Sequence, residues 1–278
     1  MNSPYELSAN LSLMFTEHPL LERFAAAEAA GFSAAELWWP FAEAQPTDDA
    51  IDELVAAATT TGVRLTGLNF FAGDMPACMR GVVSVPERQS EFRDNVAVVV
   101  DIATRTGCRH FNALYGSRQP TSTPELQDEY AIANLVFATE SLAELGGTVL
   151  VEPLSGVAEY PIRTAAQAIA VIDAVRAQVH GGAIALLYDT FHLTNNGDDP
   201  VAVAAEYGPA IGHVQIADTP GRGQPDTGSI DFAAVFIALK NTGYSGLVAC
   251  EYSPTVPTAE SLEWIGRYSQ VDLAAQPL

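Results

Sequence analysis

The chain has 278 residues, 48% of them hydrophobic, and a formal net charge of −21. This negative charge argues against binding to nucleic acids and to anionic membranes, because both need a basic surface that neutralises phosphate groups. The sequence has no run of about 18 apolar residues, and its first residues, MNSPYELSANLSLMF, lack the features of a secretory signal, so we expect no membrane span and a cytoplasmic protein.

Short β-rich runs alternate with helical stretches along the whole chain. The predicted strands cover residues 7–15, 34–40, 64–71, 109–116, 148–155, 184–192, 211–218 and 246–254. The predicted helices cover residues 19–31, 48–61, 86–106, 124–145, 164–178, 199–207, 230–242 and 258–269. This alternation predicts parallel strands joined by right-handed helical crossovers.

Two α/β architectures share this alternation, namely an open doubly wound sheet and a closed barrel. No G-x-G-x-x-G motif follows the first predicted strand, so the usual dinucleotide-binding form of the open sheet is not supported. Eight βα units of about 33 residues each suit a barrel better. With no linker-like segment in the sequence, we predict a single (β/α)8 TIM barrel over residues 1–278.

Acidic residues lie at the ends of three predicted strands. Glu152, Asp189 and Glu251 end the runs TVLVE, ALLYD and LVACE, and Gln215 lies within IGHVQIAD. The carboxyl ends of TIM-barrel strands meet at one mouth, where these enzymes carry their active sites. Three carboxylates gathered there stay ionised only around a positive charge, and their oxygens suit Mg²⁺ or Mn²⁺. The alternative is that each acid caps the following helix or pairs with an arginine.

Two histidines lie close to these residues. If the strand stops at Asp189, the residues TFH begin a loop, and His192 can fold back over the mouth to bind a substrate oxygen or orient a ligand. The alternative is a capping or packing histidine. His213 precedes Gln215 by two positions, so both face the same way on a strand. We expect His213 to be a buried, hydrogen-bonded residue rather than a ligand, while Glu36 on the second strand stays undecided.

Two long loops each carry one arginine. Residues 72–86 contain Arg80 and residues 218–230 contain Arg222. Long loops in compact barrels are often lids, and an arginine fork suits the carboxylate of a substrate. Plain surface loops are the alternative.

Several segments resemble the hydroxypyruvate isomerase family of xylose-isomerase-like barrels: FFAGDMPACMRGV, FRDNVAVVVDIATRTGC, VEPLS, LYDTFH, GHVQIADTPGRGQPDTGSID and GYSGLVACEYSP. The resemblance implies a barrel that interconverts hydroxypyruvate and tartronate semialdehyde. It implies that Glu152 of VEP and Glu251 of CEY are the catalytic pair. It further implies that these two, with Asp189 and Gln215, bind a divalent metal, and that His192 and Arg222 contact substrate.

One segment departs from the family pattern. After the EP motif the family usually reads INxRDxPGF, whereas this chain reads LSGVAEYPIRTAAQA and is about two residues shorter. This loop borders the substrate pocket, so a different 2-oxo or hydroxy acid, such as a 2-oxotetronate, becomes a credible substrate.

The sequence therefore predicts a metal-dependent aldose–ketose type isomerase. It would act on a small anionic hydroxy-oxo acid through an enediolate, with Arg222 or Arg80 binding the substrate carboxylate. The alternatives are a ketose 3-epimerase, an abasic-site endonuclease and a non-catalytic ligand-binding barrel. The sequence leaves a homo-oligomer open.

Overall fold

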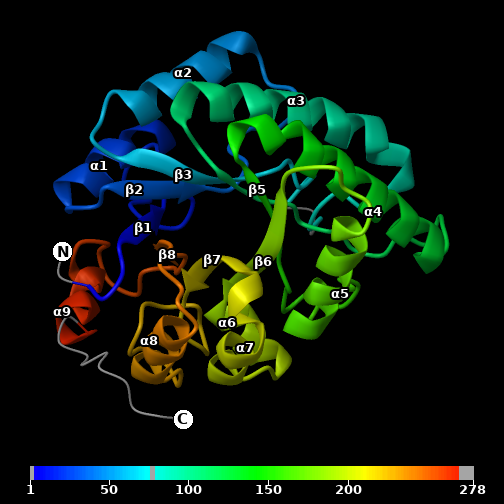
Figure 1. The fold of residues 1–278 in the computed structure, drawn as a ribbon. Coiled ribbons are helices and arrows are strands. Elements are labelled where there is room, and N and C mark those ends of the chain that lie inside the picture. The colour runs from blue at the N-terminus through cyan, green and yellow to red at the C-terminus, as the bar shows by residue number, and fades with distance from the viewer. Residues whose placement is uncertain (1–2, 76–78, 269–278) are drawn as a thin grey trace.

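The computed structural model describes residues 3–75 and 79–268. Within them, parallel strands close into a barrel in the order of the chain, with the last strand paired to the first (Figure 1). The strands are β1 (Leu7–Asn10), β2 (Ala34–Leu37), β3 (Arg64–Asn69), β4 (His110–Asn112), β5 (Thr148–Val151), β6 (Ala183–Asp189), β7 (Ile211–Ile216) and β8 (Val248–Cys250). The predicted (β/α)8 barrel is confirmed.

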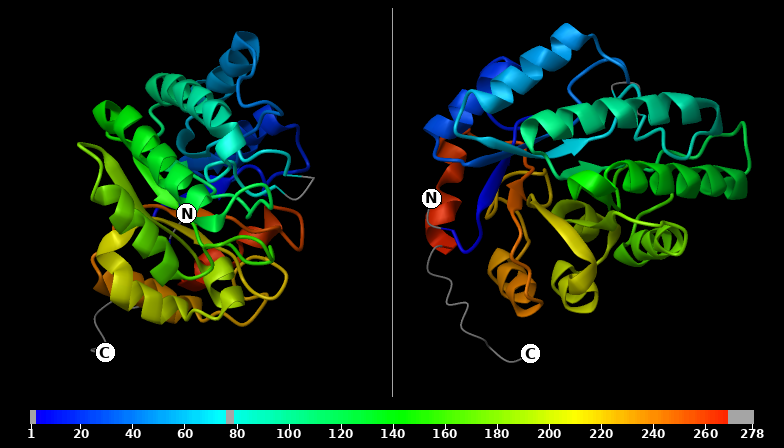
Figure 2. Two further views of the ribbon diagram at one scale, coloured as in Figure 1. Left: turned by 90° about the vertical axis from the view of Figure 1, so that its right-hand side faces the viewer. Right: turned by 45° about the horizontal axis from the view of Figure 1, so that its top comes forward.

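Helices surround the barrel and connect successive strands (Figure 2). The α-helices are α1 (Arg23–Ala29), α2 (Asp48–Thr59), α3 (Gln89–Thr106), α4 (Pro124–Ser141), α5 (Ala165–Arg176), α6 (Thr190–Asn196), α7 (Pro200–Tyr207), α8 (Phe232–Asn241) and α9 (Trp264–Tyr268). Short 3₁₀ helices are η1 (Leu20–Glu22), η2 (Pro86–Arg88), η3 (Ala143–Leu145), η4 (Gly208–Ala210) and η5 (Glu260–Leu262). None of the helices in the described ranges has both the length and the hydrophobicity to cross a bilayer.

Helix α2 illustrates how the local sequence builds the outer layer. The Thr47 side chain caps its first turn by accepting a hydrogen bond from the Ala50 amide. Its buried residues, Ile51, Leu54 and Val55, recur at helical spacing and therefore form one stripe that packs on the barrel.

The interior of the barrel differs from this outer core. A small apolar cluster of Leu150, Ala185 and Leu187 is separate from the main core. On β7, His213 and Gln215 alternate with outward-facing residues, and Asp189 lies beside Gln215 in the strand register. The barrel interior is therefore partly polar.

The predicted strands extend beyond the observed ones. The first was predicted over residues 7–15, but β1 ends at Asn10, and Leu11 and Met14 are buried in the turn that follows. The eighth was predicted over 246–254, whereas β8 covers only Val248–Cys250. The apolar residues beyond these strand ends lie in loops that pack against the core. Hydrophobicity alone does not distinguish such loops from strands.

Candidate functional site

The four predicted metal ligands lie together at the carboxyl ends of neighbouring strands. Glu152 directly follows β5, Asp189 ends β6, Gln215 lies in β7 and Glu251 directly follows β8. None of the four residues is more than 3% exposed. The barrel topology thus gathers residues spread over about 100 positions of the chain into one buried group.

A cavity of about 530 Å³ opens above this group. The predicted catalytic and substrate-binding residues that line it are Arg80, Glu152, His192, Arg222 and Glu251. The structure therefore brings every predicted substrate-binding residue to the same cavity as both glutamates.

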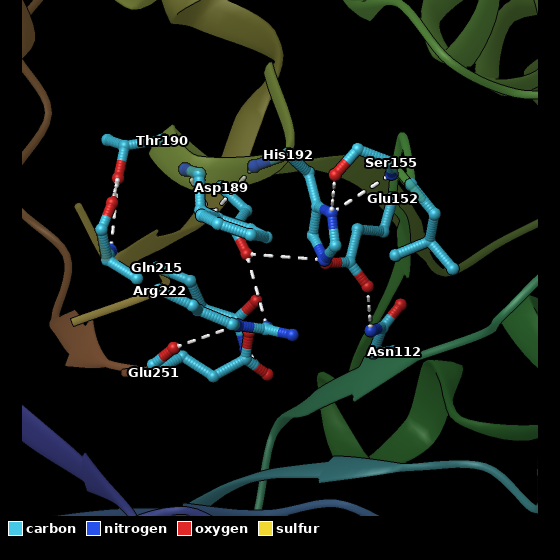
Figure 3. A network of polar contacts seen from close by, with 12 residues as sticks. Asn112, Glu152, Ser155, Asp189, Thr190, His192, Gln215, Arg222 and Glu251 are labelled. Carbon is cyan, nitrogen blue, oxygen red and sulfur yellow. Dashed lines mark hydrogen bonds and ion pairs between the residues drawn. The ribbon is translucent and has the colours of Figure 1, made fainter. Parts of the chain in front are cut away.

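Asp189 and His192 meet through a helical turn, not through the predicted loop. Helix α6 starts immediately after Asp189, whose Oδ1 accepts hydrogen bonds from the amides of Phe191 (2.7 Å) and His192 (3.4 Å). His192 Nε2 lies 3.8 Å from Asp189 Oδ2 and 3.8 Å from Glu152 Oε1 (Figure 3). The prediction of a loop at TFH was wrong, because the aspartate caps a helix there. The prediction that His192 turns back toward Asp189 is confirmed.

Arg222 reaches into the carboxylate group. Its Nη2 forms an ion pair with Glu251 Oε2 and lies 3.6 Å from Asp189 Oδ2 (Figure 3). The guanidinium lies over the rings of Trp38 and Phe191, which hold it in place by cation–π contacts. Both alternatives to metal binding therefore do occur. Glu251 pairs with an arginine, and Asp189 caps a helix.

Arg80 lies on the opposite loop. Its Nη1 donates to the backbone oxygens of Met75 (3.0 Å) and Met79 (2.7 Å), so the side chain is tied to its own loop at the cavity wall. The predicted lid over residues 72–86 includes residues 76–78, which lie outside the described residues.

Beneath the cavity, Glu36 is the centre of a second polar layer. Its carboxylate accepts hydrogen bonds from Asn10 Nδ2 (2.8 Å), His213 Nε2 (2.6 Å) and Gln215 Nε2 (2.7 Å). The prediction that His213 is buried and hydrogen-bonded is confirmed. Because Gln215 uses its Nε2 as donor to Glu36, its Oε1 points the other way.

The carboxyl groups at the mouth have pKa values above their ordinary values. Burial raises the pKa of Glu152 well above its ordinary value, and the charges of Glu251 and Asp189 raise it further. Burial also raises the pKa of Asp189, and it raises the pKa of Glu251 to about 7, although Arg222 acts to lower both. A further cation beside Arg222 would allow the three acids to ionise together.

Glu36 shows the opposite behaviour. Burial acts to raise its pKa, but the charge and hydrogen bond of His213, with the donors of Asn10 and Gln215, bring the pKa of Glu36 below its ordinary value. Glu36 is therefore an ionised carboxylate, whereas burial raises the pKa values of the acids at the mouth.

The residues at the mouth fit a hard divalent cation. Within the described residues, Asp189 Oδ2 and Gln215 Oε1 are buried side-chain oxygens without a hydrogen-bond partner. Glu152, Asp189 and His192 each offer a ligand-type atom within 4.8 Å of the others. A bound cation would satisfy such oxygens, and carboxylate and amide oxygens are the ligands that Mg²⁺ and Mn²⁺ prefer.

Four further residues of the site were not predicted. Asn112 Nδ2 donates to Glu152 Oε2 (2.7 Å), and Trp38 Nε1 donates to Glu251 Oε1 (2.7 Å). Asn10 contacts Glu36, and Ser155 contacts His192. Asn10 and Asn112 end their strands, as Asp189 does, so the same signal was present for both. No sequence signal indicates the roles of Trp38 and Ser155.

Comparison with known proteins agrees with this geometry. A Streptomyces coelicolor protein, provisionally named a hydroxypyruvate isomerase, is 45% identical over 93% of this chain and 94% of its own length. The hydroxypyruvate isomerase of Escherichia coli is 32% identical over 94% of this chain and 98% of its own. A 2-oxo-tetronate isomerase of Cupriavidus necator is 30% identical over 94% of this chain and 97% of its own.

A solved structure from Brucella melitensis, described as an AP endonuclease of family 2, also matches. It is 32% identical, with a TM-score of 0.85 over 95% of this chain and 99% of that chain. The sequence model of the xylose isomerase-like TIM barrel family matches residues 24–268. The resemblance seen in the sequence motifs is thereby confirmed, and the chain belongs to the xylose isomerase-like TIM barrel family.

Proposed function

We propose that this protein is a divalent-metal-dependent isomerase that interconverts hydroxypyruvate and tartronate semialdehyde, or a closely related short hydroxy-oxo acid. The observation that carries the proposal is the convergence of two buried glutamates, Glu152 and Glu251, on one cavity that also contains Arg222. The names of the relatives from S. coelicolor and E. coli support the same reaction.

The reaction moves one hydrogen between neighbouring carbons. A glutamate carboxylate removes a proton from C3 of hydroxypyruvate, and the electron pair forms an enediolate across C2 and C3. Transfer of the hydroxyl hydrogen from O3 to O2, with return of a proton to C2, then gives tartronate semialdehyde. Glu152 and Glu251 come from β5 and β8 and both border the cavity, so the same or the opposite glutamate can return the proton.

The metal ligands in this proposal are Glu152, Asp189, Gln215 and Glu251. A bound Mg²⁺ or Mn²⁺ would polarise the two reacting substrate oxygens and stabilise the negative charge of the enediolate. The unbonded Oδ2 of Asp189 and Oε1 of Gln215 support this assignment.

The remaining residues bind and orient the substrate. Arg222 and Arg80 line the cavity and would neutralise the substrate carboxylate in an otherwise acidic protein. His192 would contact a substrate oxygen, because its Nε2 lies on the cavity side between Glu152 and Asp189. A free ketose has no carboxylate for these arginines, which argues against a ketose 3-epimerase.

A 2-oxotetronate is the second candidate substrate. The segment that follows Glu152, including Ser155, Gly156 and Val157, lines the cavity and departs from the family pattern. An adjoining cleft of about 630 Å³ shares Trp38, Asn69 and Met75 with this cavity, so a longer acid has room. The C. necator relative supports this candidate.

The two remaining alternatives are less well supported. An abasic-site endonuclease has to bind a phosphate backbone, which a net charge of −21 opposes, although the B. melitensis structure carries that description. A non-catalytic binding barrel has no use for the paired glutamates.

Proton exchange tests the proposal directly. Candidate acids and a free ketose are incubated with the protein in deuterium oxide, with and without Mg²⁺, and followed by NMR. We expect deuterium incorporation and product from hydroxypyruvate or a 2-oxotetronate only with Mg²⁺. Exchange at the same rate without metal would remove the cation from the mechanism, and no exchange with any acid would exclude this isomerase function.

A further inference from the structure

The contacts of Ser155 determine the chemical form of His192. The Ser155 amide nitrogen lies 3.0 Å from His192 Nδ1 with hydrogen-bond geometry, and the Ser155 Oγ lies 2.8 Å from the same atom (Figure 3). A backbone N–H is always a donor, so Nδ1 must accept and cannot carry a hydrogen. The hydroxyl can adapt to either form, but the amide cannot.

The hydrogen of the neutral imidazole therefore lies on Nε2. That nitrogen is 3.8 Å from both Glu152 Oε1 and Asp189 Oδ2, at the mouth of the barrel. His192 is 6% exposed and its ring packs edge-on against Phe191, with centroids 5.2 Å apart, so the ring cannot readily flip to exchange its two nitrogens.

A nitrogen that carries a hydrogen has no lone pair for a metal. By position alone, His192 groups with Glu152 and Asp189 as a metal ligand. The Ser155 contact excludes His192 from the metal ligands. Its Nε2 could bind a cation only if the ring lost its remaining proton, or if Nδ1 no longer accepted a hydrogen bond from the Ser155 amide.

We propose that Ser155 is a positioning residue that fixes His192 as the Nε2–H tautomer, which makes His192 a hydrogen-bond donor to substrate rather than a metal ligand or a base. The part that concerns substrate rests on the proposed function, whereas the tautomer and the exclusion from the metal do not. Ser155 lies in the segment after Glu152 that departs from the family pattern.

NMR of the ¹⁵N-labelled protein reads the tautomer directly, because a ring nitrogen that carries a hydrogen differs in chemical shift from one with a free lone pair. The His192→Gln variant identifies the signals of His192 by their loss. We expect an unprotonated Nδ1 and a protonated Nε2, both alone and with saturating Mg²⁺. An Nδ1–H tautomer, or loss of the Nε2 hydrogen on adding Mg²⁺, would overturn the proposal.

Two substitutions at Ser155 separate its amide from its hydroxyl. Ser155→Ala keeps the backbone N–H, and His192 should stay the Nε2–H tautomer. Ser155→Pro removes that N–H, and the spectrum should then show a mixture of tautomers. An unchanged spectrum in the proline variant would refute the role of Ser155. If the proline variant does not fold, the wild-type spectrum still decides the tautomer.

Kinetics test the donor role. Glutamine at position 192 can present an N–H near the position of Nε2, whereas leucine cannot. We expect kcat within about tenfold of wild type for His192→Gln and about 100-fold lower for His192→Leu. Equal loss in both variants would contradict the donor role. If the wild-type protein shows no isomerase activity, only this kinetic arm fails, and the spectra still test the tautomer.

Discussion

The side-chain amide of Gln215 donates a 2.7 Å hydrogen bond to Glu36 Oε1 across the interior of the barrel, from β7 to β2. The same nitrogen lies 3.2 Å from Glu251 Oε1. Both contacts use the NH₂ group and leave the amide oxygen of Gln215 without a hydrogen-bond partner, and Asp189 lies beside Gln215 in the strand register. Glu36 thereby orients the amide of a proposed metal ligand.

Glu36→Gln should weaken metal binding. The neutral amide can present either end to Gln215, so Gln215 loses its single orientation. Loss of a residue that orients a metal ligand typically lowers metal affinity about 10- to 100-fold, and calorimetric titration with Mn²⁺ measures this loss. Ser8→Ala is the matched control, because Ser8 is buried in the same barrel and contacts Thr66 instead. Unchanged Mn²⁺ affinity in Glu36→Gln would contradict the role of Glu36.

Glu152→Gln and Glu251→Gln should each lose turnover while the fold is kept. An amide has nearly the shape of the carboxyl group but cannot take a proton from carbon, so we expect a loss of about 10²–10⁴-fold in kcat. Deuterium exchange into substrate, followed by NMR, checks this, and circular dichroism checks the fold. Glu159→Gln is the control, because Glu159 is exposed in the loop after Glu152. Activity close to wild type in either of the two test variants would exclude that glutamate as the acid/base group.

Divalent cations should stabilise the protein more at high pH than at low pH. Burial raises the folded-state pKa of Glu152, Asp189 and Glu251, in the last case to about 7. Without a cation, each group then binds its proton more tightly in the folded than in the unfolded chain. The folded state therefore loses stability as the pH rises from about 4.5 through about 7.

A bound divalent cation takes the place of the protons on these three carboxyl groups. At a concentration about 100 times its dissociation constant, the cation would add about 2.7 kcal/mol to the free energy of unfolding, or several degrees to Tm. Thermal unfolding with and without Mg²⁺ at about pH 5 and about pH 8 measures this, and the gain should be larger at about pH 8. The same gain at both values would show that these carboxylates do not bind the ion.

Arg222→Lys should raise KM for the acid substrate. Lysine keeps the positive charge but loses the planar fork that binds a carboxylate at two points, and it loses the stacking on Trp38 and Phe191. We expect an increase of about tenfold or more in KM, with some loss of kcat because Glu251 loses its partner. Arg267→Lys is the control, since Arg267 is exposed and pairs with Asp226, which lies in the same loop as Arg222. Steady-state kinetics that show equal KM for Arg222→Lys and wild type would place the substrate carboxylate elsewhere.

Much of the fold followed from the sequence because the information is local. The alternation of strands and helices indicates a parallel barrel, and a barrel brings the carboxyl ends of all its strands to one face. Acids at three strand ends could therefore be assigned to one site before any distance was known. Helix α6 was missed, because seven residues carry too little periodicity to distinguish it from a loop.

The amino-acid sequence alone indicates the barrel, the acidic residues at its mouth and the resemblance to an isomerase family. The pairing of the site residues is visible only in the folded chain: Arg222 pairs with Glu251, Glu36 with Gln215, and Ser155 with His192. Each of these pairs joins residues more than 25 positions apart, and a hydrogen bond or ion pair depends on distances and directions that only the packed chain defines. Even Asp189 and His192, three positions apart, share a site because the aspartate caps the helix that carries the histidine.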